Sequence, residues 1–245
     1  LLGIICGGVK SKFFTEYLAA KAGALNNDFS KPEYRIKDPM STAADYSFGC
    51  IDNQSDKNKI IKMRDVGEMW GTGLFKANAC DFCDDVTTEL ADISLGDAWL
   101  PPYNQDGLGH NVIVTRSALA NQILMAGHED KELELEDLAL SECLLSQQGS
   151  FNHRHDAIGL RTILAEREGY SIPIKRFGAE TLPIYLRLVH ILRRKVRRKS
   201  LIVWAEQRDA ERFDKRMRFV LFELKVITKI SHIIKKFKRK LEGRA

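Results

Sequence analysis

The sequence predicts an α/β or α+β fold, in which a mixed sheet with flanking helices is followed by a basic, helical C-terminal extension. Two observations predict this fold. Over the first two-thirds of the chain, short apolar runs suited to strands alternate with amphipathic helical segments. Beyond Pro173, helical patterns rich in Arg and Lys replace this alternation. The 245 residues suffice for one or two domains, and we place the division between 1–172 and 173–245.

The composition is that of a globular protein with charge unevenly distributed. Hydrophobic residues make up 44% and charged residues 29%, which excludes a disordered chain. No apolar run approaches the roughly 20 residues of a membrane span. An odd number of cysteines, five, and the lack of signal-peptide features argue against a secreted disulfide framework, so we expect a cytoplasmic protein. Since the chain begins without Met, in what reads as a strand, we expect it to be part of a longer protein.

The first predicted unit is a strand, a glycine turn and a helix. Residues 1–5 form a continuous apolar run, typical of a strand buried on both faces. A Cys-Gly-Gly turn follows it, and Ser11 is placed to cap a helix that ends at Gly23. Glycines allow close approach of a cofactor, and the helix start, with Lys10 and Lys12 nearby, favours an anion. An ordinary strand-to-helix turn is the favoured alternative.

Further strands and helices are predicted from periodicity and capping signals. Cys50 is expected to be a small buried residue within its strand, and Ile93 and Leu95 to point inward from theirs. Ser117 is expected to cap a helix that ends at Gly127. The strands are predicted at 34–38, 46–52, 60–63, 91–95 and 112–115, and another helical run is predicted around 138–145.

The pair Cys80 and Cys83 concentrates the chemistry of the sequence. Thiols at this spacing can share a metal, share an iron-sulfur cluster or form a redox disulfide. Neighbouring aspartates, Asp81, Asp84 and Asp85, disfavour the reactive thiolate that redox disulfides need. Structural zinc needs four ligands, but no second Cys-x-x-Cys exists, whereas a cluster commonly recruits distant thiols. Both metal alternatives stay open from the residues alone.

Four blocks of sequence resemble the C-terminal region of the coenzyme F-420 hydrogenase/dehydrogenase beta-subunit family, which is related to 7-hydroxymethyl chlorophyll a reductase. They occur in the family's order and cover roughly two-thirds of the chain. The blocks are LGIICGGVKS at 2–11, CDFCDDVTTELADISLGDAW at 80–99, GHNVIVTR at 109–116 and SQQGSFNHRH at 146–155.

The resemblance implies an oxidoreductase that passes electrons between FAD, a 4Fe-4S cluster and a hydride donor or acceptor, which in archaeal members is coenzyme F-420. Cys6, Cys80 and Cys83 match the family's thiols. A Gly-Thr-Pro-Cys motif, which supplies the fourth ligand in the family, is missing from this sequence. No catalytic residue is assigned. The residues expected on the flavin side are Gly7, Gly8, Gly96, Asp97 and Trp99.

The expected partners are an electron-carrier protein or another redox subunit. His153, Arg154 and Arg161 are expected to be surface cations on a solvated helix, with contact to an anionic ligand as the less favoured alternative. Nucleic acid is disfavoured because no aromatic stacking platform is evident. The alternative function is a zinc-stabilised or metal-free interaction module that docks through its basic C-terminal helices to a membrane or a partner enzyme.

The last predicted helix carries an apolar stripe opposite a lysine-rich face. It can pack on the domain, bind a partner or lie on the inner face of an anionic membrane. We expect a projecting or loosely docked helix, since the preceding segments are also cationic. The stripe consists of Val220, Leu224, Ile227, Ile230, Ile234 and Phe237.

Overall fold

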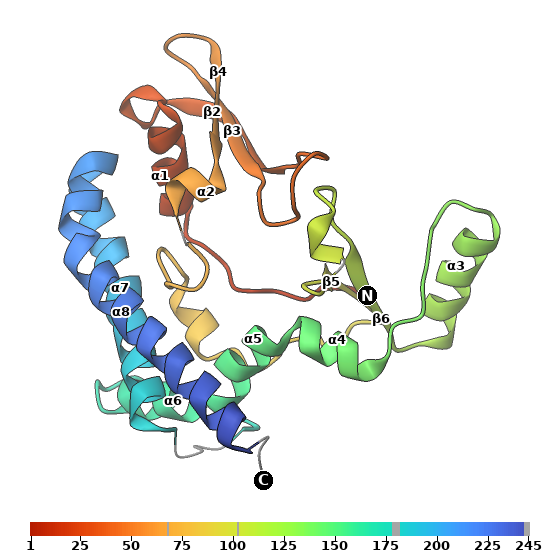
Figure 1. The fold of residues 1–245 in the computed structure, drawn as a ribbon. Coiled ribbons are helices and arrows are strands. Elements are labelled where there is room, and N and C mark those ends of the chain that lie inside the picture. Colours follow the sequence, from red (N-terminus) through yellow and green to blue (C-terminus); the bar gives the residue numbers. More distant parts are fainter. Residues whose placement is uncertain (68, 102, 178–181, 243–245) are drawn as a thin grey trace. The chain divides into compact units, whose positions relative to one another are not determined.

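The chain forms two compact units, each assembled from separate stretches of sequence. The computed structural model describes residues 1–67, 69–101, 103–177 and 182–242 (Figure 1). This division follows the contacts within the chain and differs from the boundary expected at residue 172, which stays a prediction about the family region and its extension. Unit 1 comprises Leu1–Gly7, Lys37–Tyr46 and Cys83–His155, and unit 2 comprises Gly8–Ile36, Ser47–Phe82 and Asp156–Ala245.

Both units mix strands with helices, which confirms the predicted fold class. The elements of unit 1 are β1 (Leu2–Ile4), β5 (Ile93–Asp97), the 3-10 turn η3 (Tyr103–Gln105), β6 (Asn111–Thr115), α3 (Ala118–Glu129), α4 (Leu140–Ser146), α5 (Gln148–Phe151) and the π-helical turn η4 (Asn152–Asp156), whose last residue opens unit 2. The elements of unit 2 are α1 (Lys12–Ala22), η1 (Leu25–Asn27), β2 (Phe29–Ile36), β3 (Ser47–Asp52), β4 (Lys57–Lys62), α2 (Met63–Val66), η2 (Asn78–Asp81), α6 (Ile158–Glu166), α7 (Ile184–Gln207) and α8 (Ala210–Glu242).

The sheet of unit 1 is mixed, with strand order β1-β5-β6. β1 runs parallel to β5, and β6 runs antiparallel to it. The prediction that β1 is buried on both faces is wrong, because β1 is an edge strand and its Leu2 and Ile4 side chains are 79% and 72% exposed. Its other face is covered, since Thr88 and Ala91 lie directly over Gly3.

The buried face of β5 is the opposite of the one predicted. Ser94 and Gly96 are buried, whereas Ile93 and Leu95 are only half-buried. The side chain of Ile5 covers Gly96 on the buried face of β5. A Cβ atom built at Gly96 would lie 2.5 Å from the Cβ atom of Ile5. Close packing of β1 on β5 therefore requires a residue without a side chain at this position.

Unit 1 also contains a capped helix that the sequence predicted. The Ser117 hydroxyl accepts a hydrogen bond from the Ala120 amide at 3.3 Å, as an N-cap should. The helix α3 continues to Glu129, two residues beyond the predicted end at Gly127.

Unit 2 contains an antiparallel sheet of order β2-β3-β4 beside α1. The central strand β3 buries Cys50, as predicted. Helix α1 begins after Ser11 and ends at Gly23 in the left-handed conformation (φ 96°), also as predicted, although the Ser11 side chain makes no capping hydrogen bond.

An aromatic cluster joins α1 to the C-terminal helices within unit 2. Tyr17 and Phe75 lie between the rings of Trp204 on α7 and Phe213 on α8, with centroids 4.9 to 6.1 Å apart. All four rings are buried. Such contacts add about 0.5–1.5 kcal/mol per pair beyond the burial of area. The basic helices are therefore part of the core of this unit.

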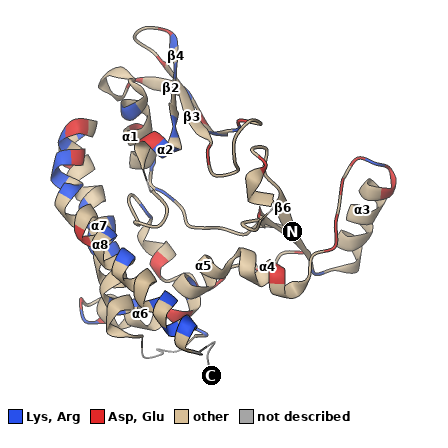
Figure 2. Cartoon of the chain, viewed as in Figure 1, with Lys and Arg blue, Asp and Glu red and all other residues tan. Residues whose placement is uncertain are grey.

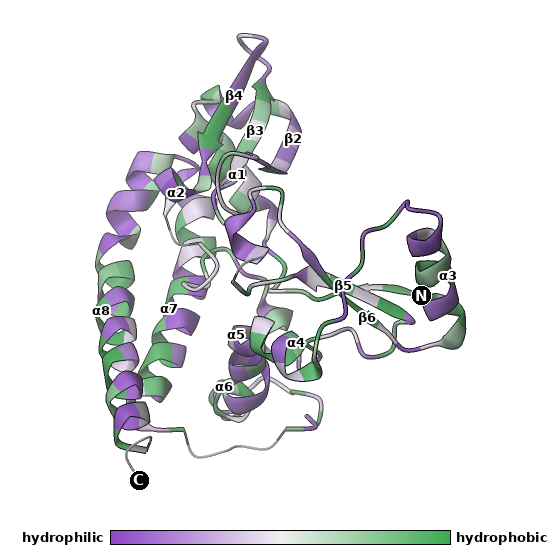
Figure 3. Cartoon of the chain, turned by 45° about the vertical axis from the view of Figure 1, so that its right-hand side comes forward, coloured by the Kyte–Doolittle hydropathy of each residue, from purple (hydrophilic) through white to green (hydrophobic). Residues whose placement is uncertain are grey.

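The expectation that α8 projects or docks loosely is wrong for its N-terminal half. Val220 and Leu224 are buried, together with Phe213 and Met217, because this row packs along α7. Ile230 and Phe237 are exposed, so the predicted stripe is covered at one end only. Apolar and polar residues alternate along both helices (Figure 3).

Replacing Gly96 by Ala should lower the free energy of unfolding by about 1–3 kcal/mol, because the new methyl group overlaps Ile5. The midpoint of urea unfolding measures this change. Gly7→Ala is the matched control, since nothing lies within 4 Å of a Cβ atom there, and it should change the stability by less than about 0.5 kcal/mol. Equal midpoints for the two variants would contradict the packing of β1 on β5.

Candidate functional site

Arg154 connects two of the predicted ligand segments within unit 1. It lies in η4, and its guanidinium donates from Nη2 to the Cys6 carbonyl and from Nη1 to the Asp85 carbonyl. The same Nη1 lies 3.6 Å from the sulfur of Cys83. The backbone of Cys6 and the side chain of Cys83 therefore contact one guanidinium, although 77 positions separate them in the sequence (83 − 6).

The prediction that Arg154 is a surface cation is wrong, because its side chain is only 4% exposed. Two backbone carbonyls supply the acceptors that a buried guanidinium needs. The neighbouring His155 is half-buried, with Nε2 placed 3.0 Å from the Asp84 carbonyl and its ring against Phe151. The polar run at 152–155, which suggests a solvated helix, in fact packs on the cysteine segment of unit 1.

Cys80 lies in unit 2, where the short helix η2 carries it into the interior. Its sulfur accepts a hydrogen bond from the Val9 amide at 3.2 Å. The Val9 carbonyl in turn accepts from the Ala77 amide at 2.8 Å, and Lys10 and Lys76 form an antiparallel bridge beside them. The segment that follows the Cys-Gly-Gly turn therefore runs alongside the segment that leads into Cys80.

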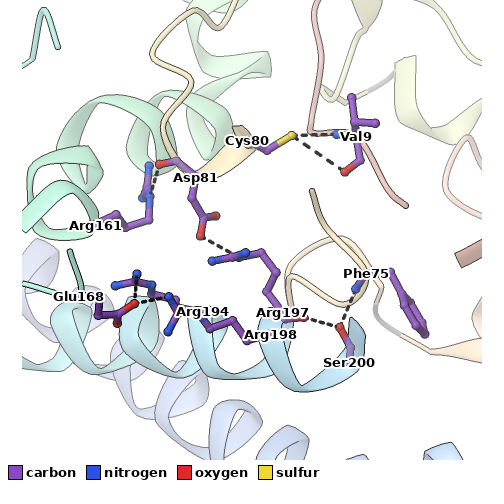
Figure 4. Close-up of polar contacts among 10 residues, drawn as sticks. All are labelled: Val9, Phe75, Cys80, Asp81, Arg161, Glu168, Arg194, Arg197, Arg198 and Ser200. Atoms are coloured by element: carbon purple, nitrogen blue, oxygen red, sulfur yellow. Dashed lines mark hydrogen bonds and ion pairs between the residues drawn. The ribbon is translucent and has the colours of Figure 1, made fainter. Parts of the chain in front are cut away.

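Asp81, the neighbour of Cys80, is bound by two buried arginines of unit 2 (Figure 4). Arg161 on α6 donates from Nε to the Asp81 carbonyl at 2.7 Å. Arg197 on α7 pairs its Nε with the Asp81 carboxylate at 2.9 Å. The prediction that Arg161 is a surface cation is also wrong, because the Asp81 carbonyl gives its guanidinium an acceptor inside the unit.

Buried positive charge surrounds His190 on α7. Burial and the nearby cations, chiefly Arg161 and Arg193, lower the pKa of His190 to about 3. The imidazole is therefore neutral at pH 7. On the same helix, burial and the adjacent Arg198 lower the pKa of Arg194, while Glu168 accepts hydrogen bonds from both arginines.

Lys10 does not face an open anion site. Its Nζ atom donates to the carbonyls of Met69 and Leu74, at 2.6 and 2.5 Å, and lies over the rings of Phe14 and Trp70. Because these groups surround the ammonium, Lys10 fits the ordinary strand-to-helix turn that the sequence favoured over an anion site. The lysine instead holds the loop at 69–74 against α1.

The residues expected on the flavin side have mixed surroundings. Gly8 has a φ of +131°, and a Cβ atom there would touch Lys76, so backbone geometry explains this glycine. The Asp97 carbonyl accepts from Gln147 at 2.8 Å, and Trp99 is 41% exposed. No atom lies within 4 Å of a Cβ atom built at Gly7, whereas Ile5 leaves no room for a side chain at Gly96. Flavin contact by these residues stays a prediction.

The predicted thiols are distributed over both units, with Cys6 and Cys83 in unit 1 and Cys80 in unit 2. In the part of the chain that the structure describes, none of the five cysteines forms a disulfide bond. Among the described residues, no group of three or more His, Cys, Asp or Glu side chains is arranged to hold a metal ion. The ligand set Cys6, Cys80 and Cys83 therefore stays a prediction.

Three arginines contact the cysteine segments, and the sequence did not predict these contacts. Arg154 and Arg197 stand in polar or basic runs that resemble solvated helix surfaces, whereas Arg161 stands in the largely apolar run at 157–165. One signal was present for α7, where His190, Arg194 and Arg197 recur at spacings of four and three. This spacing places them on one helix face, and that face is buried.

The comparison with known families identifies the class of protein. The family that comprises the C terminus of the beta subunit of coenzyme F420 hydrogenase/dehydrogenase matches residues 1–140, more than half of the chain. The chain belongs to this family, which confirms the resemblance seen in the sequence. Because the family consists of oxidoreductase subunits, a general oxidoreductase role follows, together with association with other redox subunits. No curated protein matches the chain.

The buried His190 should make the protein acid-labile. Its pKa rises from about 3 in the folded state to about 6.5 when unfolded, so below pH 6.5 the unfolded chain binds the proton first. The free energy of unfolding should therefore decrease as the pH is lowered below 6.5, and at pH 5 it should be about 2 kcal/mol lower than at neutral pH. His190→Gln should flatten this part of the curve of unfolding free energy against pH, whereas His232→Gln, at an exposed site on α8, should not. Parallel curves for all three proteins would exclude the buried neutral histidine.

Proposed function

We propose that the chain is the C-terminal part of an iron-sulfur flavoprotein that passes electrons between FAD, a 4Fe-4S cluster and a hydride donor or acceptor such as reduced coenzyme F-420. Membership of the beta-subunit family is the observation that carries this proposal. A bound flavin exchanges two electrons and a cluster exchanges one, so the two groups together connect hydride chemistry to a one-electron carrier.

The surroundings of two thiols fit ligands of a cluster. The Val9 amide donates to the Cys80 sulfur, and the Arg154 guanidinium lies within hydrogen-bonding distance of the Cys83 sulfur. Hydrogen bonds to cluster sulfurs tune the potential of a bound cluster. The Asp81 carboxylate is paired with Arg197, so its charge next to Cys80 is compensated. In this proposal, Cys6, Cys80 and Cys83 bind the cluster.

The proposal for FAD rests on the family alone. Gly7, Gly8, Gly96, Asp97 and Trp99 are the proposed flavin-side residues. Packing accounts for Gly8 and Gly96 without a cofactor, so these glycines add no independent support. The proposed partner is an electron-carrier protein or another redox subunit, and the proposed location is the cytoplasm.

The alternative function is a zinc-stabilised or metal-free interaction module. Measuring the metal content of the protein distinguishes it from the iron-sulfur flavoprotein. Full-length protein purified without oxygen should contain about four irons per chain and be brown. Cys80→Ser and Cys83→Ser should each remove the colour and most of the iron. Cys50→Ser and Cys143→Ser are the matched controls and should retain both, because these thiols belong to no predicted ligand segment. Zinc in place of iron, or four variants that behave alike, would refute the cluster.

We also propose that the uncovered face of α8 contacts an anionic membrane surface at the cytoplasmic side. Phe219, Phe222 and Phe237 are exposed on this helix, while Lys225 and Lys229 are exposed beside them. Lys and Arg recur along α8 (Figure 2). Exposed aromatic residues next to cations are typical of helices that lie on anionic lipid. None of the described helices is both long and apolar enough to cross a membrane.

Phe219→Ser combined with Phe222→Ser should weaken binding of the full-length protein to vesicles that contain anionic lipid, because it removes apolar area that would enter the lipid interface. Co-sedimentation measures the bound fraction, which should also fall as salt rises. Leu188→Ser, at an exposed position on α7, is the control. Equal binding by wild type and the double variant, unaffected by salt, would leave no membrane role for this face.

A further inference from the structure

We propose that Arg197 and Arg161 are positioning residues for Cys80 and act on it through Asp81. Both arginines lie beyond residue 140, outside the part of the chain that the family model matches. The proposal rests on the function proposed above, because it assigns the helical region a task at the cysteine segment.

Asp81 directly follows Cys80 and is held by two arginines. Its backbone carbonyl accepts from Arg161 on α6, and its carboxylate pairs with Arg197 on α7. All three side chains are buried, with exposures of 5%, 2% and 3% for Asp81, Arg161 and Arg197. Contacts to both the backbone and the side chain restrict the torsion angles of Asp81. They therefore also restrict the direction in which the side chain of the preceding residue, Cys80, points.

Helix α7 holds the other end of the same segment. The Ser200 hydroxyl, one turn after Arg197, accepts a hydrogen bond from the Phe75 amide at 2.9 Å and donates to the Arg197 carbonyl at 2.7 Å. Ser200 is fully buried. Two neighbouring side chains of one helix therefore attach to positions 75 and 81, and the segment between them carries Cys80 (Figure 4).

A buried ion pair is a poor source of net stability, because removing two charges from water offsets most of their attraction. It does fix geometry, since leaving either charge buried without its partner is strongly unfavourable. The ion pair is therefore better suited to positioning Cys80 than to stabilising the fold. The aromatic cluster already packs α7 against the rest of unit 2. Groups that orient ligands typically change metal affinity 10–100-fold when they are removed.

The test is a double-mutant cycle in the full-length protein with Asp81→Asn, Arg197→Met and both together. After iron is removed with a chelator, the rate of Cys80 alkylation by iodoacetamide is followed by mass spectrometry. Cys50 and Cys143 of the same molecules report any general loosening of the fold. Arg198→Met is the matched control, since it removes the same charge from α7 at a partly exposed pair with Glu168.

Each single variant should alkylate Cys80 about tenfold faster than wild type, and iron retained by the anaerobically purified variants should fall by a similar factor. The double variant should be affected less than the product of the single effects, because no unpaired charge is left. Arg198→Met should match wild type. Should Arg197→Met fail to fold, Arg197→Lys, which keeps the charge and loses the planar group, takes its place with the same expected direction.

Cys80 alkylation at the wild-type rate in the Arg197 variant, or single effects that simply multiply, would overturn the positioning role. A parallel rise at Cys50 and Cys143 would also overturn it, since the pair would then support the whole fold. If no protein contains iron while the alkylation rates still couple, the positioning role stands and the proposed cluster fails, so the two failures are distinguishable.

Discussion

A buried guanidinium cannot lose its charge, and this constraint organises both cysteine segments. An arginine that enters the interior must find carbonyl or carboxylate acceptors, and here those acceptors belong to the cysteine segments. Arg154 binds the carbonyls of Cys6 and Asp85 in unit 1. Arg161 and Arg197 bind Asp81 in unit 2. Arg154 in unit 1 and Arg161 in unit 2 thus hold the backbone next to a thiol, and Arg197 holds the side chain of the residue that follows Cys80.

The arginines also connect the two halves of the sequence in functional terms. The family match identifies the first 140 residues as an oxidoreductase beta-subunit region and leaves the helices that follow without an assignment. Those helices nevertheless supply buried contacts to the thiol segments and to the aromatic cluster around Phe75. Within unit 2, α7 and α8 therefore belong to the core, and α7 also contacts the segment that carries Cys80. Their basic outer surfaces are a separate property.

Periodicity and capping signals predicted the elements more reliably than they predicted burial. The mixed sheet, the ends of α1 and the Ser117 cap are as expected, because these features depend on local chemistry. The inward face of β5 was predicted wrongly, since Ile5 packs so closely on Gly96 that the small residues point inward. Arg154 was predicted to be solvated because its acceptors are backbone carbonyls distant in sequence, which no side-chain pattern records. The thiols were found through motif resemblance, whereas their arginine partners depend on tertiary structure.

A crystal structure of the full-length protein purified without oxygen will show whether buried arginines hold the cysteine segments. We expect Arg154 inside unit 1, with its guanidinium bonded to the Cys6 carbonyl and a nitrogen within about 3.6 Å of the Cys83 sulfur. An Arg154 side chain extended into solvent, with Cys6 and Cys83 held by other groups, would contradict it.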